Sequence, residues 1–230
     1  MPPPARWSTP GLLATALGAF AAAVAVSLVA IFPLGVLRVP AEQLSPYDVF
    51  ILALASDGAL LVALFLLGRR LLGLRPADLG FRRPTRDALR LAALAAVALW
   101  ALAIGLNAIQ TLVFGAHPQA LVVTVSGHSG PLALLLDLAT GALVAPIAEE
   151  TLFRGLLFAG LAQRMPFRAA AGISAFLFAI SHGPAVLVPI FVLGLGLAWL
   201  YARTRTIWAP VAAHAIVNTI SLVLVFVAPR

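Results

Sequence analysis

Residues 132–161 read LALLLDLATGALVAPIAEETLFRGLLFAGL, an apolar run that carries two adjacent glutamates, Glu149 and Glu150. A bilayer core of about 30 Å needs roughly 20 apolar residues in a helix, so the run is long enough to cross it. An ionisable group at that depth costs roughly 2.5 kcal/mol or more, and such groups usually have a function. The stretch therefore predicts a membrane-spanning helix that carries a functional site.

The composition of the whole chain is that of a membrane protein. Its 230 residues have a mean hydropathy of +1.06, and 62% are hydrophobic while 10% are charged. A soluble domain has about 25% charged residues. The sequence predicts an all-α, polytopic transmembrane helix bundle of about seven spans, formed as a single integral membrane domain over residues 1–230. The other six predicted spans are 12–37, 49–67, 88–114, 169–181, 186–201 and 207–227.

Arginine placement predicts how the bundle is oriented. Segment 69–90 contains seven of the 15 basic residues, whereas loops 116–130 and 183–185 contain none. Because short cytoplasmic loops are enriched in basic residues, we expect a cytoplasmic N-terminus, an external C-terminus and a cytoplasmic basic linker at 69–90. Leucines and Phe81 interleave with the arginines of this linker. It is expected either to lie at an anionic membrane surface or to form a solvated loop.

Composition also excludes several kinds of partner and site. The net charge of +7 is carried by arginine alone, and the arginines cluster in loops rather than along one helical face, so no nucleic-acid partner is expected. The chain has no cysteine, which excludes disulfides, thiolate metal sites and cysteine nucleophiles. An alanine-rich chain without lysine is typical of a GC-rich bacterial genome. The expected location is therefore the plasma membrane of a bacterium.

The two adjacent glutamates are expected to have different roles. Glu150 lies four residues before Arg154, the favourable order for an ion pair on a helix. Glu149 points about 100° away around the helix and cannot share that arginine as easily. Pro146 removes a backbone hydrogen bond three residues before Glu149, which predicts a kink or an opening there. One glutamate is therefore expected to be structural and the other free to act beside irregular backbone.

Two further pairs of polar or aromatic residues have helical spacing. Phe178 and His182 share one face of a helix, and so do His214 and Asn218. Carboxylates and imidazoles are the groups that general acid–base catalysis and metal ligation use. Taken singly, each histidine fits a packing role, and Glu150 with its arginine fits a clamp between helices. Their occurrence together favours a functional site.

The remaining polar residues of the spans and loops are given no catalytic role. His117 and His128 fall in a predicted external loop and are expected to be solvated. Asp57 and Asp137 show that the chain tolerates other acids in or near its spans. Gln110 is expected to make a hydrogen bond between helices.

Three motifs follow one another along the chain: E-E-x-x-x-R at Glu149–Arg154, F-x-x-x-H at Phe178–His182 and H-x-x-x-N at His214–Asn218. This ordered set resembles the CAAX protease and bacteriocin-processing family of intramembrane endopeptidases, with no departure at a signature position. The resemblance covers residues 131–221, the expected catalytic core. The sequence GFRRP at 80–84 is similar to the linker before this core in bacterial members.

The resemblance implies that an activated water hydrolyses a peptide bond. Glu149 is then the expected general base, and His182 is expected to hold or polarise the water. His214 and Asn218 are expected to donate hydrogen bonds to the developing oxyanion. The implied partners are the lipid bilayer and a peptide or membrane-protein substrate. The supporting residues of the signature are Glu150, Arg154 and Phe178.

Metal participation is left open by the sequence. Glu149, His182 and His214 are side chains of the right type to bind zinc, and catalytic zinc takes three protein ligands plus water. The family is classed by name as a metalloprotease, while a metal-free glutamate mechanism has been argued for relatives. We therefore treat a divalent metal such as zinc as permitted rather than required.

A non-catalytic interpretation uses the same residues. The chain fits a membrane immunity or scaffold factor that keeps the fold, or a small proton-coupled transporter with a Glu–His–His relay. The intact motifs argue against the first, and the absence of inverted repeats argues against common transporter folds. Peptide cleavage that is lost with Glu149→Ala separates these alternatives from an enzyme.

Overall fold

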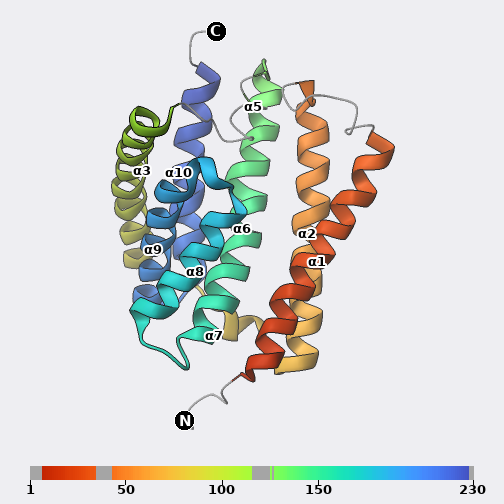
Figure 1. Ribbon diagram of the computed structural model, residues 1–230, viewed down its shortest axis with the longest axis vertical. Coiled ribbons are helices and arrows are strands. Elements are labelled where there is room, and N and C mark those ends of the chain that lie inside the picture. The colour runs from red at the N-terminus through yellow and green to blue at the C-terminus, as the bar shows by residue number, and fades with distance from the viewer. Residues whose placement is uncertain (1–6, 35–42, 116–124, 126, 228–230) are drawn as a thin grey trace.

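The apolar runs of the sequence form long helices in the computed structural model, which describes residues 7–34, 43–115, 125 and 127–227. A helical run from Pro131 to Leu161 lies at the centre, and other helices surround it (Figure 1). The surrounding helices are α1 (Thr9–Leu34), α2 (Pro46–Leu72), α3 (Arg86–Phe114), α8 (Phe167–Ser181), α9 (Leu187–Thr204) and α10 (Trp208–Val227).

The central run changes its helical geometry several times. Two of its segments are π-helical, with wider turns than the α-helical segments between them. The run consists of α5 (Pro131–Leu138), η4 (Ala139–Val144), α6 (Ala145–Glu150), η5 (Thr151–Phe158) and α7 (Ala159–Leu161). Two short 3₁₀ turns, η3 (Pro76–Leu79) and η6 (Pro184–Val186), lie in the connections.

Membrane-crossing length supports the predicted bundle. Six helical runs of the described residues are long and apolar enough to cross a membrane, and α8, with 15 residues, is a shorter apolar helix. The predicted all-α, multi-pass membrane fold is therefore confirmed, with α8 as the short seventh segment. The start of α1 and the end of α10 lie at opposite ends of the bundle (Figure 1).

The orientation of the bundle stays a prediction with a direct test. Reporter fusions placed at Pro84 and at Ser129 are expected to report opposite sides of the membrane, with Pro84 in the cytoplasm. The reason is that the arginines of the short loops gather at the Pro84 end. Two reporters on the same side would show that α3 does not cross the bilayer.

The helices on either side of the centre pack differently. α1 and α2 form an antiparallel pair on one side of the central run, while α10, α3 and α9 pack together on the other (Figure 1). α8 packs between α9 and η5. The central run thus contacts both groups and is the element on which they meet.

Capping residues fix where α2 begins and ends. The Ser45 hydroxyl accepts a hydrogen bond from the Asp48 backbone N–H, and the Asp48 carboxylate accepts one from the Ser45 N–H. This reciprocal capping box satisfies two N–H groups that the helix start leaves unpaired. The helix ends at Gly73, which has the left-handed φ of 65° that glycine adopts without strain.

The basic linker lies against the bundle rather than apart from it. The Gly80 carbonyl accepts a hydrogen bond from Ile207 N, and the Arg82 carbonyl accepts one from the Thr206 hydroxyl, both at 2.8 Å. A Cβ at Gly155 would lie 3.0 Å from the Leu79 carbonyl oxygen, so the linker approaches η5 closely. The linker therefore ties η5 to the turn between α9 and α10.

Pro146 coincides with the change from π to α geometry. In η4 the hydrogen bonds run from each N–H to the carbonyl five residues earlier, and the last is Ala145 N–H to Thr140 O. The next bond in that register would join residue 146 to Gly141, but proline has no N–H to give. The opening that the sequence predicts at Pro146 is thus a widened turn.

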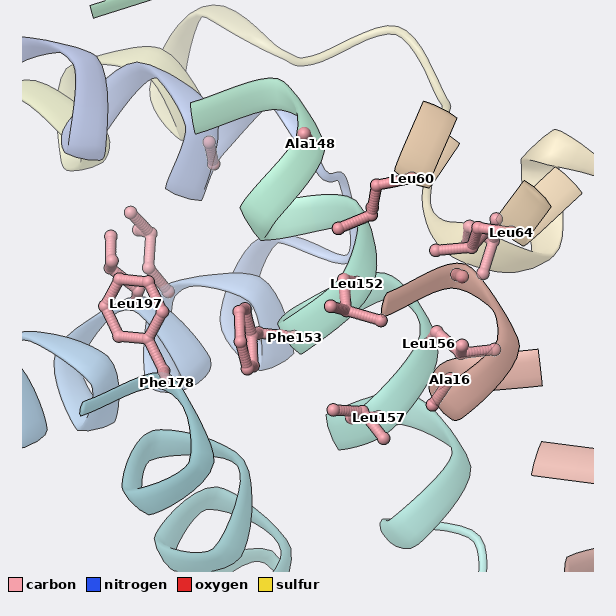
Figure 2. Close-up of a cluster of buried hydrophobic side chains, with 14 of the residues drawn as sticks. Ala16, Leu60, Leu64, Ala148, Leu152, Phe153, Leu156, Leu157, Phe178 and Leu197 are labelled. Atoms are coloured by element: carbon pink, nitrogen blue, oxygen red, sulfur yellow. The ribbon is translucent and has the colours of Figure 1, made fainter. Parts of the chain in front are cut away.

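Apolar side chains of η5 point to both groups of helices. Figure 2 shows Leu152 near Leu60 of α2 and Leu156 beside Ala16 of α1, while Phe153 lies on the side of Phe178 of α8. All of these residues belong to one buried cluster. Because lipid is as apolar as these side chains, close packing contributes most of the helix association here.

Candidate active site

Two predicted site residues, His182 and His214, meet at Glu149. His182 follows the last residue of α8, and its Nε2 lies 3.8 Å from Glu149 Oε1. His214 of α10 places its Nε2 3.8 Å from Glu149 Oε2. Glu149 and His182 retain some exposure, with side chains 25% and 16% accessible, whereas the His214 side chain is 3% accessible. The site is thus reachable from the Glu149–His182 side and closed behind His214.

Hydrogen bonds at Nδ1 fix the orientation and the tautomer of the two histidine rings. His182 Nδ1 lies 2.8 Å from the Phe178 carbonyl, and His214 Nδ1 lies 3.0 Å from Glu150 Oε1. Because a carbonyl or a carboxylate only accepts, each Nδ1 carries the hydrogen. In the neutral rings, both Nε2 lone pairs therefore face the Glu149 carboxylate.

This arrangement places three acceptors around one small space. The 3.8 Å separations exceed the roughly 3.2 Å of a hydrogen bond, so Glu149 bonds directly to neither ring. Acceptors that face one another need a shared donor, either a water molecule or an added proton on one ring. The geometry is therefore suited to holding and deprotonating water.

Glu150 is paired with Arg154, as the sequence spacing predicts. Arg154 NH1 donates to Glu150 Oε1 at 2.8 Å, and both side chains are fully buried. Arg154 NH2 also donates to the Gly194 carbonyl of α9. The same Oε1 accepts from His214, which sequence spacing does not predict because the two residues are 64 positions apart. Glu150 therefore orients His214 as well as neutralising Arg154.

The Phe178 ring packs against both imidazoles and the Arg154 guanidinium. Its ring centroid lies 4.6 Å from that of His182 and 5.7 Å from that of His214, both edge-to-face. The Arg154 guanidinium carbon lies 4.3 Å from the same centroid, within cation–π range. Phe178 thus helps to position both imidazoles and the guanidinium by packing against them.

Asn218 has a partner that the sequence did not suggest. Its Nδ2 donates to the Gly141 carbonyl at 2.6 Å. That carbonyl is the one that Pro146 leaves without a backbone donor in the π register. One of the two Asn218 amide hydrogens therefore completes the hydrogen bonding of η4, and the other remains for another acceptor.

The prediction that His128 is solvated is wrong. His128 and Asp137 are buried, and His128 Nδ1 lies 2.8 Å from Asp137 Oδ1. Its Nε2 lies 2.8 Å from the Leu44 carbonyl, so the ring joins two connections and α5. Loop position alone suggested solvent, and only the fold shows that the His128 ring is buried against α5. His117 lies outside the described residues.

Two other polar residues of the spans lie near the site. The Asp57 carboxylate on α2 is close enough for its charge to act on Glu149, although no role was assigned to it from the sequence. Gln110 on α3 donates to the Ala185 carbonyl of η6, the turn that follows His182. The bond predicted for Gln110 is therefore present and holds this turn to α3.

Glu149, His182 and His214 are side chains of the type that binds zinc. Within the described part of the chain, no group of three or more His, Cys, Asp or Glu side chains is placed to be assigned as a metal centre.

The comparisons with known proteins point to the same part of the chain. Residues 131–220 match the family described as "Type II CAAX prenyl endopeptidase Rce1-like". The "Putative membrane peptidase YdiL" of Bacillus subtilis (strain 168) is 34% identical over 93 residues, 40% of this chain and 38% of that protein. The match thus spans less than half of the relative's length, and no solved structure matches. Residues 131–220, which contain all three motifs, are therefore the part of the chain that is similar to this family.

Proposed function

We propose that this protein is an intramembrane endopeptidase that hydrolyses peptide bonds with a water activated by Glu149. The observation that carries the proposal is the placement of the Glu149 carboxylate between the Nε2 atoms of His182 and His214. A general base must reach the proton that it removes, and a water placed between these groups would lie within reach of the Glu149 carboxylate. The family match and the name of the Bacillus subtilis relative support proteolysis.

The proposed reaction begins with transfer of a water proton to Glu149. The water oxygen attacks the peptide carbonyl carbon as its O–H bond breaks, while His182 Nε2 accepts a hydrogen bond from the same water. Glu149 then passes the proton to the peptide nitrogen as the C–N bond breaks. The carboxylate is thereby returned to its starting state.

Stabilisation of the oxyanion requires a donor, and His214 meets this need only with a proton on Nε2. Its Nδ1–H already points to Glu150, so Nε2 of the neutral ring is an acceptor. We propose that His214 acts as an imidazolium, with the remaining Asn218 amide hydrogen as a second donor.

The test is cleavage of fluorogenic peptides by the detergent-purified protein. The exposed side of Glu149 and His182 suits an extended segment that enters from the membrane, so peptides or membrane-protein segments are the proposed substrates. A folded protein that cleaves none of a broad peptide set, in detergent or in vesicles, would favour the non-catalytic alternatives.

The metal question has its own expected result. Activity is expected to survive exhaustive chelation, and elemental analysis should find less than one zinc per chain. The reason is that Glu149 and the two imidazoles can hold a water through their own acceptor atoms, so a metal is permitted rather than required. Complete loss of activity on chelation, with recovery on adding zinc, would contradict this prediction.

A further inference from the structure

A cavity of about 300 Å³ lies at the arginine-rich end of the bundle. It is lined by Arg82 of the linker, Arg205 of the α9–α10 turn, Tyr201 of α9, and Phe158, where η5 ends. Phe158 is nine residues beyond Glu149, and no residue that lines the cavity belongs to the site around Glu149. The cavity is therefore separate from the site around Glu149.

The polar groups of this cavity are mostly donors without partners. The Arg205 side chain and the Tyr201 hydroxyl make no hydrogen bond within the described part of the chain. Arg82 uses only Nε, which donates to the Ala77 carbonyl, so its terminal nitrogens remain available. The one acid, Asp78, is already paired with Arg75 at 3.3 Å. Two guanidinium groups and a hydroxyl with unused hydrogens are suited to an anion with several oxygens.

The position of the cavity favours a lipid as the source of that anion. α9 spans the membrane by length and ends at Thr204, so Arg205 lies where hydrocarbon gives way to headgroups. A second hollow of about 250 Å³ shares Ala202 with the cavity and is lined by Phe167, Trp199 and Arg203. These two aromatic side chains are 42% and 45% exposed. An anion site beside an exposed aromatic surface matches an amphiphile.

We propose that this cavity binds the phosphate of a membrane phospholipid between Arg82 and Arg205, with an acyl chain along Trp199 and Phe167. Basic residues at the membrane surface attract anionic lipids. In this cavity the guanidinium groups of Arg82 and Arg205 would also donate hydrogen bonds to the phosphate oxygens. The proposal does not depend on the chemistry at Glu149.

The bound phosphate would join two segments that already contact each other. Arg82 belongs to the linker and Arg205 to the α9–α10 turn, where the Arg82 carbonyl accepts from Thr206. A ligand that binds only the folded protein raises its stability. Bound phospholipid is therefore expected to raise the melting temperature of the purified protein.

The experiment uses native mass spectrometry and thermal melting of the full chain in detergent. The probes are phosphatidylglycerol, diacylglycerol, which lacks the phosphate, and glycerol phosphate, which lacks the chains. Wild-type protein is expected to retain phosphatidylglycerol and neither of the others. Diacylglycerol binding as tightly as phosphatidylglycerol would overturn the phosphate assignment. Equal binding of glycerol phosphate would overturn the lipid assignment.

Matched variants separate a built site from general attraction to charge. Arg205→Asn removes the charge with a residue that tolerates the left-handed φ of 54° at this position. It is expected to weaken phosphatidylglycerol binding about tenfold or more, as is Arg82→Gln. Arg205→Lys keeps the charge and should retain most of the binding. The control Arg90→Gln removes a charge on α3, outside the cavity lining, and an equal loss there would overturn the proposal.

Discussion

Glu149→Gln is expected to leave the protein folded and abundant while lowering peptide cleavage by about 10²–10⁴-fold or more. The amide has the shape of the carboxylate but cannot take a proton from water. Glu149 makes no direct hydrogen bond to His182 or His214, so removing its charge should change the free energy of unfolding little. The measurement is kcat on a fluorogenic peptide, with the melting temperature recorded beside it.

Asp57→Asn is the matched control for this variant. It makes the same carboxylate-to-amide change on α2, at a residue whose charge acts on Glu149. It is expected to retain most of the activity, because the described partners of the two imidazoles include Glu149, Glu150 and the Phe178 carbonyl but not Asp57. Retained activity in Glu149→Gln, or complete loss in Asp57→Asn alone, would move the general base away from Glu149.

Glu150→Gln is expected to destabilise the protein strongly. It leaves the fully buried Arg154 without its counter-charge, and breaking a buried pair in this way costs about 3–5 kcal/mol. For a chain of this size we expect the melting temperature to fall by about 10 °C, from roughly 2–4 °C per kcal/mol. Activity should fall further than stability explains, because the same carboxylate oxygen orients His214.

The double variant Glu150→Gln/Arg154→Gln separates these two effects. Stability should recover in part, because no unpaired charge is then buried. Activity should stay low, because His214 still lacks the carboxylate beside its Nδ1–H. If activity recovers together with stability, Glu150 acts only on the fold. If Glu150→Gln is fully stable yet inactive, Glu150 rather than Glu149 becomes the candidate base.

Local sequence patterns predicted the elements and the short-range contacts correctly. Apolar run length identified the spans, and four-residue spacing identified the Glu150–Arg154 pair, because both depend on the geometry of one helix. The family resemblance, not any distance, named the residues that meet at Glu149. Their catalytic roles stay predictions.

Contacts between distant segments were beyond the sequence. The bond between His214 and Glu150 and the burial of His128 against Asp137 depend on how separate helices come together. No periodicity within one segment carries that information. His128 was assigned to solvent for the same reason, since hydropathy does not show which residues of the predicted 116–130 loop are buried.

The hydrogen bond from Asn218 to Gly141 makes two residues on different helices dependent on each other. Because Pro146 has no N–H, the Gly141 carbonyl needs a donor from another helix, and the Asn218 amide supplies it. A substitution at either residue therefore changes what the other one does. A variant chain with alanine at position 146 regains its own N–H, and the amide at position 218 is then released from this task. Loss of Asn218 while Pro146 remains leaves a carbonyl in the membrane interior without a donor. Substitution of Pro146 before Asn218 therefore keeps a donor for the Gly141 carbonyl at every step, whereas the reverse order does not.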